Sequence, residues 1–223
     1  MKTKKRILSL FLAMMLMVTL VPGTVFAEEP AGGGSADNNY EEFISAMNDP
    51  AVNNVVVDFD LVLEGFQVFH KNVEITGAGS LKLEDFSILI LDNCTLAING
   101  GSEIGTGARL VNRGAIEVSD TGDITNNGIL MTIYPASVTN NGTVSVGASC
   151  EFWMVDKLVG VAEDEGNKSP DWSGTGNSPS DFLRIADVST ADALIYAMNS
   201  TAHSEIWLSD LGDTLDDQGN PVS

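Results

Sequence analysis

The chain has 223 residues with 11 Lys and Arg against 31 Asp and Glu, so its formal net charge at pH 7 is -20. Phosphate backbones demand a clustered basic surface, and this charge balance excludes a basic nucleic-acid-binding protein. Hydrophobic residues make up 43% of the chain and 22 residues are glycine, a composition that excludes both an acidic disordered tail and a collagen-like fibre.

Residues 1–27 have the pattern of a secretory signal peptide. A basic start from Lys2 to Arg6 is followed by an apolar run from Ile7 to Val21 and by the small-residue cleavage site Val25-Phe26-Ala27. The apolar run has about 15 residues, fewer than the ~20 that span a bilayer, which favours cleavage over an uncleaved anchor. We therefore expect a secreted or cell-surface protein with no membrane span in the mature chain. Residues 28–38 are expected to be a flexible, Gly-rich leader.

A capped helix is predicted directly after this leader. Asn39 followed by Glu42 fits a helix start, and 48-NDP-50 fits its end. The open edge of a stacked-strand protein invites aggregation unless it is covered, so we expect this helix to cap the strands that follow. Its apolar face consists of Phe43, Ile44, Ala46 and Met47.

Three segments between residues 110 and 146 superimpose without gaps at a period of 14. They are 110-LVNRGAIEV-118, 124-ITNNGILMT-132 and 138-VTNNGTVSV-146. A fixed period with Asn and Gly at one phase is typical of a repeat protein. Within each segment apolar residues alternate with polar ones at a spacing of two, which predicts strands with one buried face.

Asn and Gly tolerate the left-handed backbone of a corner, so their recurrence predicts corners between strands. The predicted fold class is therefore all-β, a parallel β-helix or β-solenoid that forms a capped domain over residues 39–160. Whether one coil takes one repeat unit or more stays open, and Asn112, Asn126 and Asn140 are candidates for a stacked amide ladder. Shorter predicted strands precede the repeats at 55-VVV-57, 73-VEI-75, 81-LKL-83, 88-ILIL-91 and 96-LAI-98.

The three repeats and the predicted helix resemble the right-handed parallel β-helix proteins of the pectate-lyase-like group. The resemblance is greatest to the N-x-G-rich solenoids of bacterial surface proteins and adhesins. It covers about 120 residues and implies an architecture that hosts polysaccharide lyases, hydrolases, adhesins and inert stalks alike, so it does not imply one activity.

Residues 161–185 are predicted as a linker, because 163-EDEGNKSPDWSGTGNSPSDF-182 is rich in Gly, Pro, Ser and Asp and has no periodicity. Residues 186–223 are predicted as a partial second copy of the capping helix and first strand, since 191-ADALIYAMNSTAHSEIWL-208 aligns with 40-YEEFISAMNDPAVNNVVV-57 and Thr190 matches the cap Asn39. Such a copy either opens another solenoid, as in a truncated paralogue, or folds back as a terminal cap. Reuse of a whole cap motif favours the first alternative.

Cys94 and Cys150 are expected to be two independently packed thiols. An exported protein with two cysteines suggests a disulfide. In a solenoid, however, residues 56 positions apart lie several coils apart at about 4.8 Å per coil, beyond the ~7 Å Cα limit of a bridge. With His70 and His203 also distant in sequence, no zinc site is expected.

No catalytic residue and no metal ligand are predicted. Asp58 with Asp60 and Asp120 with Asp123 are candidates for Ca²⁺, although a solvated acidic surface accounts for both pairs, and no other cofactor is expected. Aromatic rings stack on sugars, so Trp172 and Trp153 are candidate sugar contacts, whereas the alternation around Trp207 predicts a core position.

These features together favour a secreted or cell-surface structural or adhesive β-solenoid module, adhesin-like and without catalysis. The alternative is a carbohydrate-active β-helix, either a polysaccharide lyase or hydrolase or its sugar-binding appendage. The expected partners are a cell-surface or extracellular polysaccharide or other surface proteins, and not nucleic acid.

Overall fold

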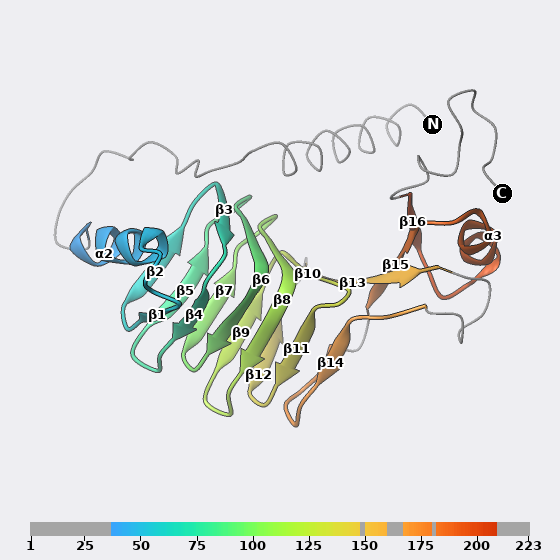
Figure 1. Ribbon diagram of the computed structural model, residues 1–223. Helices are drawn as coiled ribbons and strands as arrows, with labels where there is room; N and C mark the ends of the chain where they lie inside the picture. Colours follow the sequence, from blue (N-terminus) through green and yellow to red (C-terminus); the bar gives the residue numbers. More distant parts are fainter. Residues whose placement is uncertain (1–36, 148–149, 160–166, 180–181, 209–223) are drawn as a thin grey trace. The chain divides into compact units, whose positions relative to one another are not determined.

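The computed structural model describes residues 37–147, 150–159, 167–179 and 182–208. These residues form a parallel β-solenoid with one helix near its N-terminal end and another near the C-terminus (Figure 1), which confirms the predicted fold class. The expected signal peptide and most of the expected leader lie outside the described residues. No described helix is long and apolar enough to cross a membrane.

The chain coils through three faces, which we name A, B and C, and strands on each face pair in parallel with those of the next coil. Face A contains β1 (Asn54–Val57), β4 (Asn72–Ile75), the second halves of β6 (Ile88–Ile98) and β8 (Arg109–Val118), β11 (Ser137–Asn140) and β14 (Asp171–Ser173). Face B contains β2 (Asp60–Leu63), β5 (Ser80–Leu83), β7 (Gly101–Ile104), β9 (Asp123–Asn126) and β12 (Thr143–Val146). Face C contains β3 (Phe66–Phe69), the first halves of β6 and β8, β10 (Ile129–Ile133), β13 (Glu151–Leu158), β15 (Leu183–Val188) and β16 (Glu205–Leu208).

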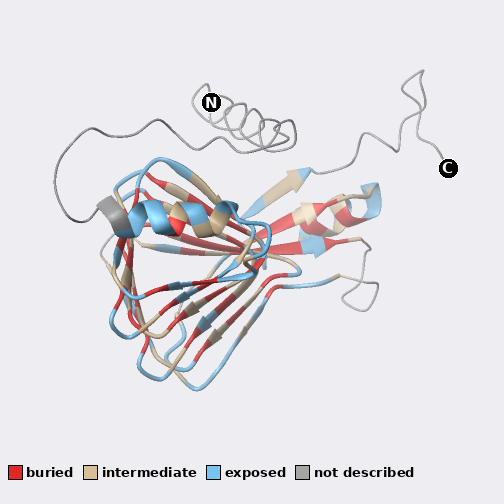
Figure 2. Ribbon diagram, turned by 60° about the vertical axis from the view of Figure 1, so that its left-hand side comes forward, coloured by how far each residue is buried: buried red, intermediate tan, exposed pale blue. Residues whose placement is uncertain are grey.

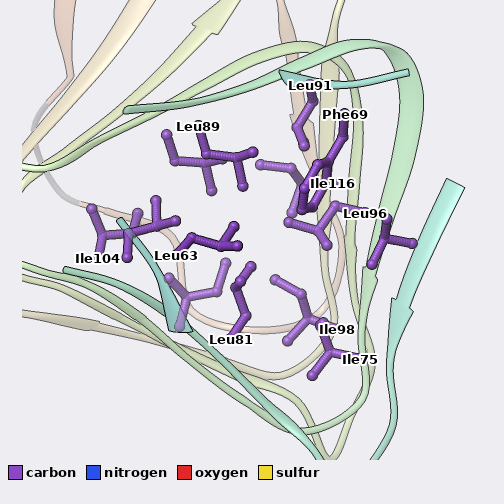
Figure 3. Close-up of a cluster of buried hydrophobic side chains, with 14 of the residues drawn as sticks. Leu63, Phe69, Ile75, Leu81, Leu89, Leu91, Leu96, Ile98, Ile104 and Ile116 are labelled. Atoms are coloured by element: carbon purple, nitrogen blue, oxygen red, sulfur yellow. The ribbon is translucent and has the colours of Figure 1, made fainter. Parts of the chain in front are cut away.

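Aliphatic side chains fill the inside of the coil. Along β1, β2 and β4 exposed and buried residues alternate strictly, as the spacing of two predicts (Figure 2). Buried side chains from all three faces, among them Leu63, Ile75 and Leu89, point toward one another in the interior (Figure 3). Each such side chain contributes roughly 1.5–3 kcal/mol by leaving water, so the core alone accounts for most of the driving force.

One complete coil has three sides and is longer than the 14-residue repeat unit. On face C, Leu89 pairs with Leu110 and Leu110 with Leu130, which are 21 and 20 residues apart. The 14-residue period therefore spans two sides, and the repeats begin on three different faces: Leu110 on face C, Ile124 on face B and Val138 on face A.

The three repeat asparagines consequently occupy three different corners and do not form an amide ladder. Asn112 and Asn126 are fully buried. The Oδ1 of Asn126 accepts a hydrogen bond from the Gly128 amide (3.0 Å), and its Nδ2 donates to the Glu151 carbonyl (3.2 Å). Asn112 does the same with the Gly114 amide and the Ser137 carbonyl. Each asparagine thus closes its own corner and ties it to the next coil.

Helix α2 (Asp37–Asn48) lies at the N-terminal end of the coil, as predicted. Phe43 is buried, and its ring centroid is 5.7 Å from that of Phe69 in β3. The helix includes Asn39, so the predicted cap at Asn39 is wrong: the helical backbone already begins at Asp37.

Part of the predicted linker 161–185 is built into the coil. Residues Asp171–Ser173 form β14, which pairs with β11 on face A, and β15 begins at Leu183. Trp172 and Leu183 lie in these two strands, which the polar composition of the stretch does not predict.

The second helix and strand are found where the sequence predicts them, as α3 (Ala191–Asn199) and β16. Thr190 is the N-cap, and its hydroxyl accepts from the Ala193 amide at 3.1 Å. Among the described residues this copy extends face C by pairing β16 with β15, and α3 packs on these strands with a small core of its own. The sequence alignment places Ile195 and Met198 at the positions of half-buried Ile44 and Met47, yet they are 57% and 70% exposed.

Candidate functional site

Trp172, a candidate sugar contact, lies in an aromatic cluster at the C-terminal end of the coil. Its ring centroid is 6.0 Å from that of Phe152 and 5.3 Å from that of Phe182. It is half-buried and packs against the main core. The cluster therefore seals this end of the coil, as α2 does at the other, and the exposed part of Trp172 is what remains for a ligand.

Trp153, the other candidate, lies on the outer side of face C. Its Nε1 donates a 2.8 Å hydrogen bond to Glu151 Oε2, and the half-buried ring packs with Met131, Val155 and Ile185. Trp207, predicted as a core residue, packs half-buried in the same outer cluster. The structure thus places Trp153 and Trp172 on different surfaces of the coil.

The outer side of face C is apolar, unlike that of face B. In strands buried on both sides apolar residues run continuously, and 88-ILIL-91 and 152-FWMV-155 have this pattern. One outer row on face C, in cross-strand register, consists of Val68, Ile90, Val111, Met131, Trp153 and Leu183. A corresponding outer row on face B consists of Asp60, Ser80, Gly101, Asp123 and Thr143.

The two carboxylate pairs proposed for Ca²⁺ lie on the outside of the coil. Asp58 and Asp60 are exposed, and Asp60 Oδ1 accepts a 2.7 Å hydrogen bond from the Ser80 hydroxyl. Asp120 is in an exposed turn before Asp123, the first residue of β9. Within the described ranges, no three His, Cys, Asp or Glu side chains come together as a group that would hold a metal ion.

A buried carboxylate that the sequence does not reveal joins β13 to β15 and to the residues just before β16. The Asp156 side chain is 3% exposed and accepts two hydrogen bonds from the Arg184 guanidinium, at 2.9 and 2.8 Å. It also bonds His203 Nε2 at 2.9 Å. The His203 side chain is 6% exposed, and its Nδ1 has no hydrogen-bond partner among the described residues. Asp156 thus links β13 to β15 through Arg184, and to the segment before β16 through His203. We call these three residues the Asp156 clamp.

The two cysteines are free, as expected. Cys94 is buried in the core and its thiol donates to the Phe69 carbonyl at 3.2 Å. Burial raises the pKa of the Cys94 thiol to about 11, which keeps it protonated and unreactive at neutral pH. Cys150 is half-buried against the core near the aromatic cluster.

Phe86 is the most exposed large apolar side chain described, at 78%, and it lies in the turn between faces B and C. Its φ of 64° is in the left-handed region, which bulky residues rarely adopt. A search for sugar contacts among the tryptophans misses this residue, although the polar context 84-EDFS-87 around a single phenylalanine is visible in the sequence.

Comparison with known proteins gives no match to a family model, to a curated protein or to a solved structure.

Proposed function

We propose that the chain is a secreted or cell-surface β-solenoid module with a structural or adhesive role and no catalysis of its own. The observation that carries this proposal is a regular coil whose apolar interior is covered at one end by Phe43 of α2 against Phe69 and at the other by the cluster of Phe152, Trp172 and Phe182. Covering the apolar interior at both ends disfavours stacking of one coil on another, and the outer rows of side chains are then the surface available for contacts. The signal-peptide pattern of residues 1–27 supports export, and the repeats support a right-handed, pectate-lyase-like coil of the bacterial surface-protein kind.

A carbohydrate-active β-helix is the alternative, and Trp153 favours it. A half-buried indole held by Glu151 on the outside of the coil combines an apolar ring with a carboxylate. This is the kind of pairing that orients a sugar. Trp172 is the second candidate contact, through the part of its ring that the aromatic cluster leaves exposed.

The test is retention of the secreted chain on isolated cell walls and on a panel of polysaccharides, with and without calcium, while new reducing ends are counted. Retention without new reducing ends supports the adhesive module. Release of sugar ends contradicts the absence of catalysis and favours the alternative.

Two variants separate packing from binding at the tryptophans. We expect Trp172→Ala to lower stability by about 3 kcal/mol, because it opens the end of the coil. Trp153→Ala is expected to cost less, since its ring lies outside. If the alternative is correct, Trp153→Ala also weakens retention on polysaccharide at unchanged fold.

A further inference from the structure

The connection between faces B and C is longer in the two neighbouring coils that contain Phe86 and Thr106 than in the coil before them and the coil after them. Two residues connect these faces at 64–65 and at 127–128, but four residues connect them at 84–87 and at 105–108. The two longer turns are hydrogen-bonded to each other, because the Phe86 amide donates to the Thr106 carbonyl (3.1 Å) and the Thr106 amide donates to Asp85 Oδ1 (2.8 Å). In this pair of turns the Phe86 side chain is 78% exposed.

The exposed Phe86 ring lies with one edge over Gly107 of the neighbouring turn. A Cβ on Gly107 would lie 2.7 Å from ring atom Cδ1 and 2.8 Å from Cε1, so a larger residue at this position would displace the ring from where it lies. Gly107 itself has φ +70°. The turn thus adopts a backbone that is unfavourable for phenylalanine and presents an apolar ring to water, two costs that point to a contact made outside the chain.

The residues around the Phe86 ring indicate which class of ligand it would contact. Half-buried Glu84 and exposed Asp85 directly precede Phe86 in the turn, and Glu84 Oε1 lies 2.9 Å from Lys82 Nζ. Carboxylates accept hydrogen bonds from hydroxyl groups, whereas they and the net charge of -20 repel anionic polymers. Phe66, 45% exposed, begins the strand of face C on the preceding coil and adds a second apolar ring to this edge. An apolar ring beside carboxylates fits the C–H face and hydroxyl rim of a neutral sugar.

We propose that Phe86 is a stacking platform for the pyranose rings of a neutral polysaccharide, with Asp85 and Glu84 accepting hydrogen bonds from its hydroxyl groups. This inference rests on the proposed adhesive role and gives that role a ligand class and a site.

Phe86→Asn tests the platform, because asparagine tolerates the left-handed backbone and removes only the ring. Binding of xyloglucan, mannan and dextran to immobilised protein is measured, with polygalacturonate as an anionic comparison and thermal unfolding recorded in parallel. Wild type is expected to bind at least one neutral glycan and not polygalacturonate. Phe86→Asn is expected to bind at least tenfold more weakly with an unchanged or higher Tm, and the control Tyr40→Ala, at another exposed aromatic, is expected to bind as wild type does.

The outcomes separate the two proposals. Equal glycan binding by wild type and Phe86→Asn overturns the platform and leaves the adhesive role intact. Retention on cell walls without binding to any neutral glycan does the same. If wild type is neither retained on cell walls nor binds any glycan, the adhesive role is contradicted as well.

Discussion

The side-chain nitrogen of Asn126 donates a 3.2 Å hydrogen bond to the carbonyl oxygen of Glu151, one coil further along, while its oxygen accepts from Gly128. Asn126→Ala removes both bonds, leaving the buried Gly128 amide without its acceptor and the Glu151 carbonyl without this donor. We expect the free energy of unfolding, measured by urea titration, to fall by about 2–3 kcal/mol. Its neighbour Asn127 bonds Glu103 from a half-buried outward position, so Asn127→Ala should cost no more than about 0.5 kcal/mol. Equal losses would contradict the role of the inward asparagine.

Gly128 is required for close approach between coils. A Cβ there would lie 2.3 Å from the Ala108 carbonyl oxygen and 2.5 Å from that of Gly105. Gly128→Ala is therefore expected to lower the free energy of unfolding by about 3 kcal/mol, since backbone must move. At Gly101 the nearest atom to an added Cβ is Asp123 Oδ1 at 3.7 Å, so Gly101→Ala serves as the matched control and should change stability by less than about 1 kcal/mol.

Cys94 makes stability depend on alkaline pH. Burial raises its pKa from 9.0 to about 11 in the folded chain, so between these values the unfolded thiol loses its proton while the folded one keeps it. The stabilisation is fully present below pH 9 and falls as pH rises toward 11, by roughly 2–3 kcal/mol. Denaturant titrations across this range measure the slope. In Cys94→Ala the slope should be flatter, and an unchanged slope would assign the effect to other groups.

The Asp156 clamp is expected to hold the C-terminal strands to the coil. Asp156→Ala leaves Arg184 and buried His203 without their acceptor, at a cost of about 3 kcal/mol. Hydrogen exchange should rise in residues 183–208, whereas β1 to β12 keep their protection, because each coil contacts only its neighbours. Lys157→Ala, at the exposed adjacent position, is the control. Faster exchange throughout the chain would show that the clamp supports the whole coil.

The solenoid and its two helices could be predicted because strand alternation and corner residues are local patterns. The number of sides in each coil could not be predicted from the sequence. A repeat from Leu110 to Ile124 fixes two sides, but closure of the coil depends on Leu110 pairing with Leu130 on the next turn. That pairing is set by how the core fills, and the repeat does not encode it.

The same limit applies to the candidate site residues: their contacts join residues distant in sequence, and local patterns do not reveal such contacts. Trp172 lies in a polar stretch, and its packing partner Phe152 is distant in sequence, so its cluster is invisible to a local pattern. The partners of Asp156 are 28 and 47 residues away. Phe86 stands alone among polar residues in its turn, but its left-handed backbone and the exposure of its ring are visible only in the structure.

The three-faced coil has a mechanical consequence. Strands on every face lie across the direction in which coils stack, so the hydrogen bonds that join successive coils run along that direction. A force applied along this direction breaks these hydrogen bonds one coil at a time. Each unfolded coil of about 20 residues lengthens the chain by roughly 70 Å. A solenoid built in this way is expected to unfold in steps under tension and to absorb work over a long extension, because each step leaves the remaining coils intact.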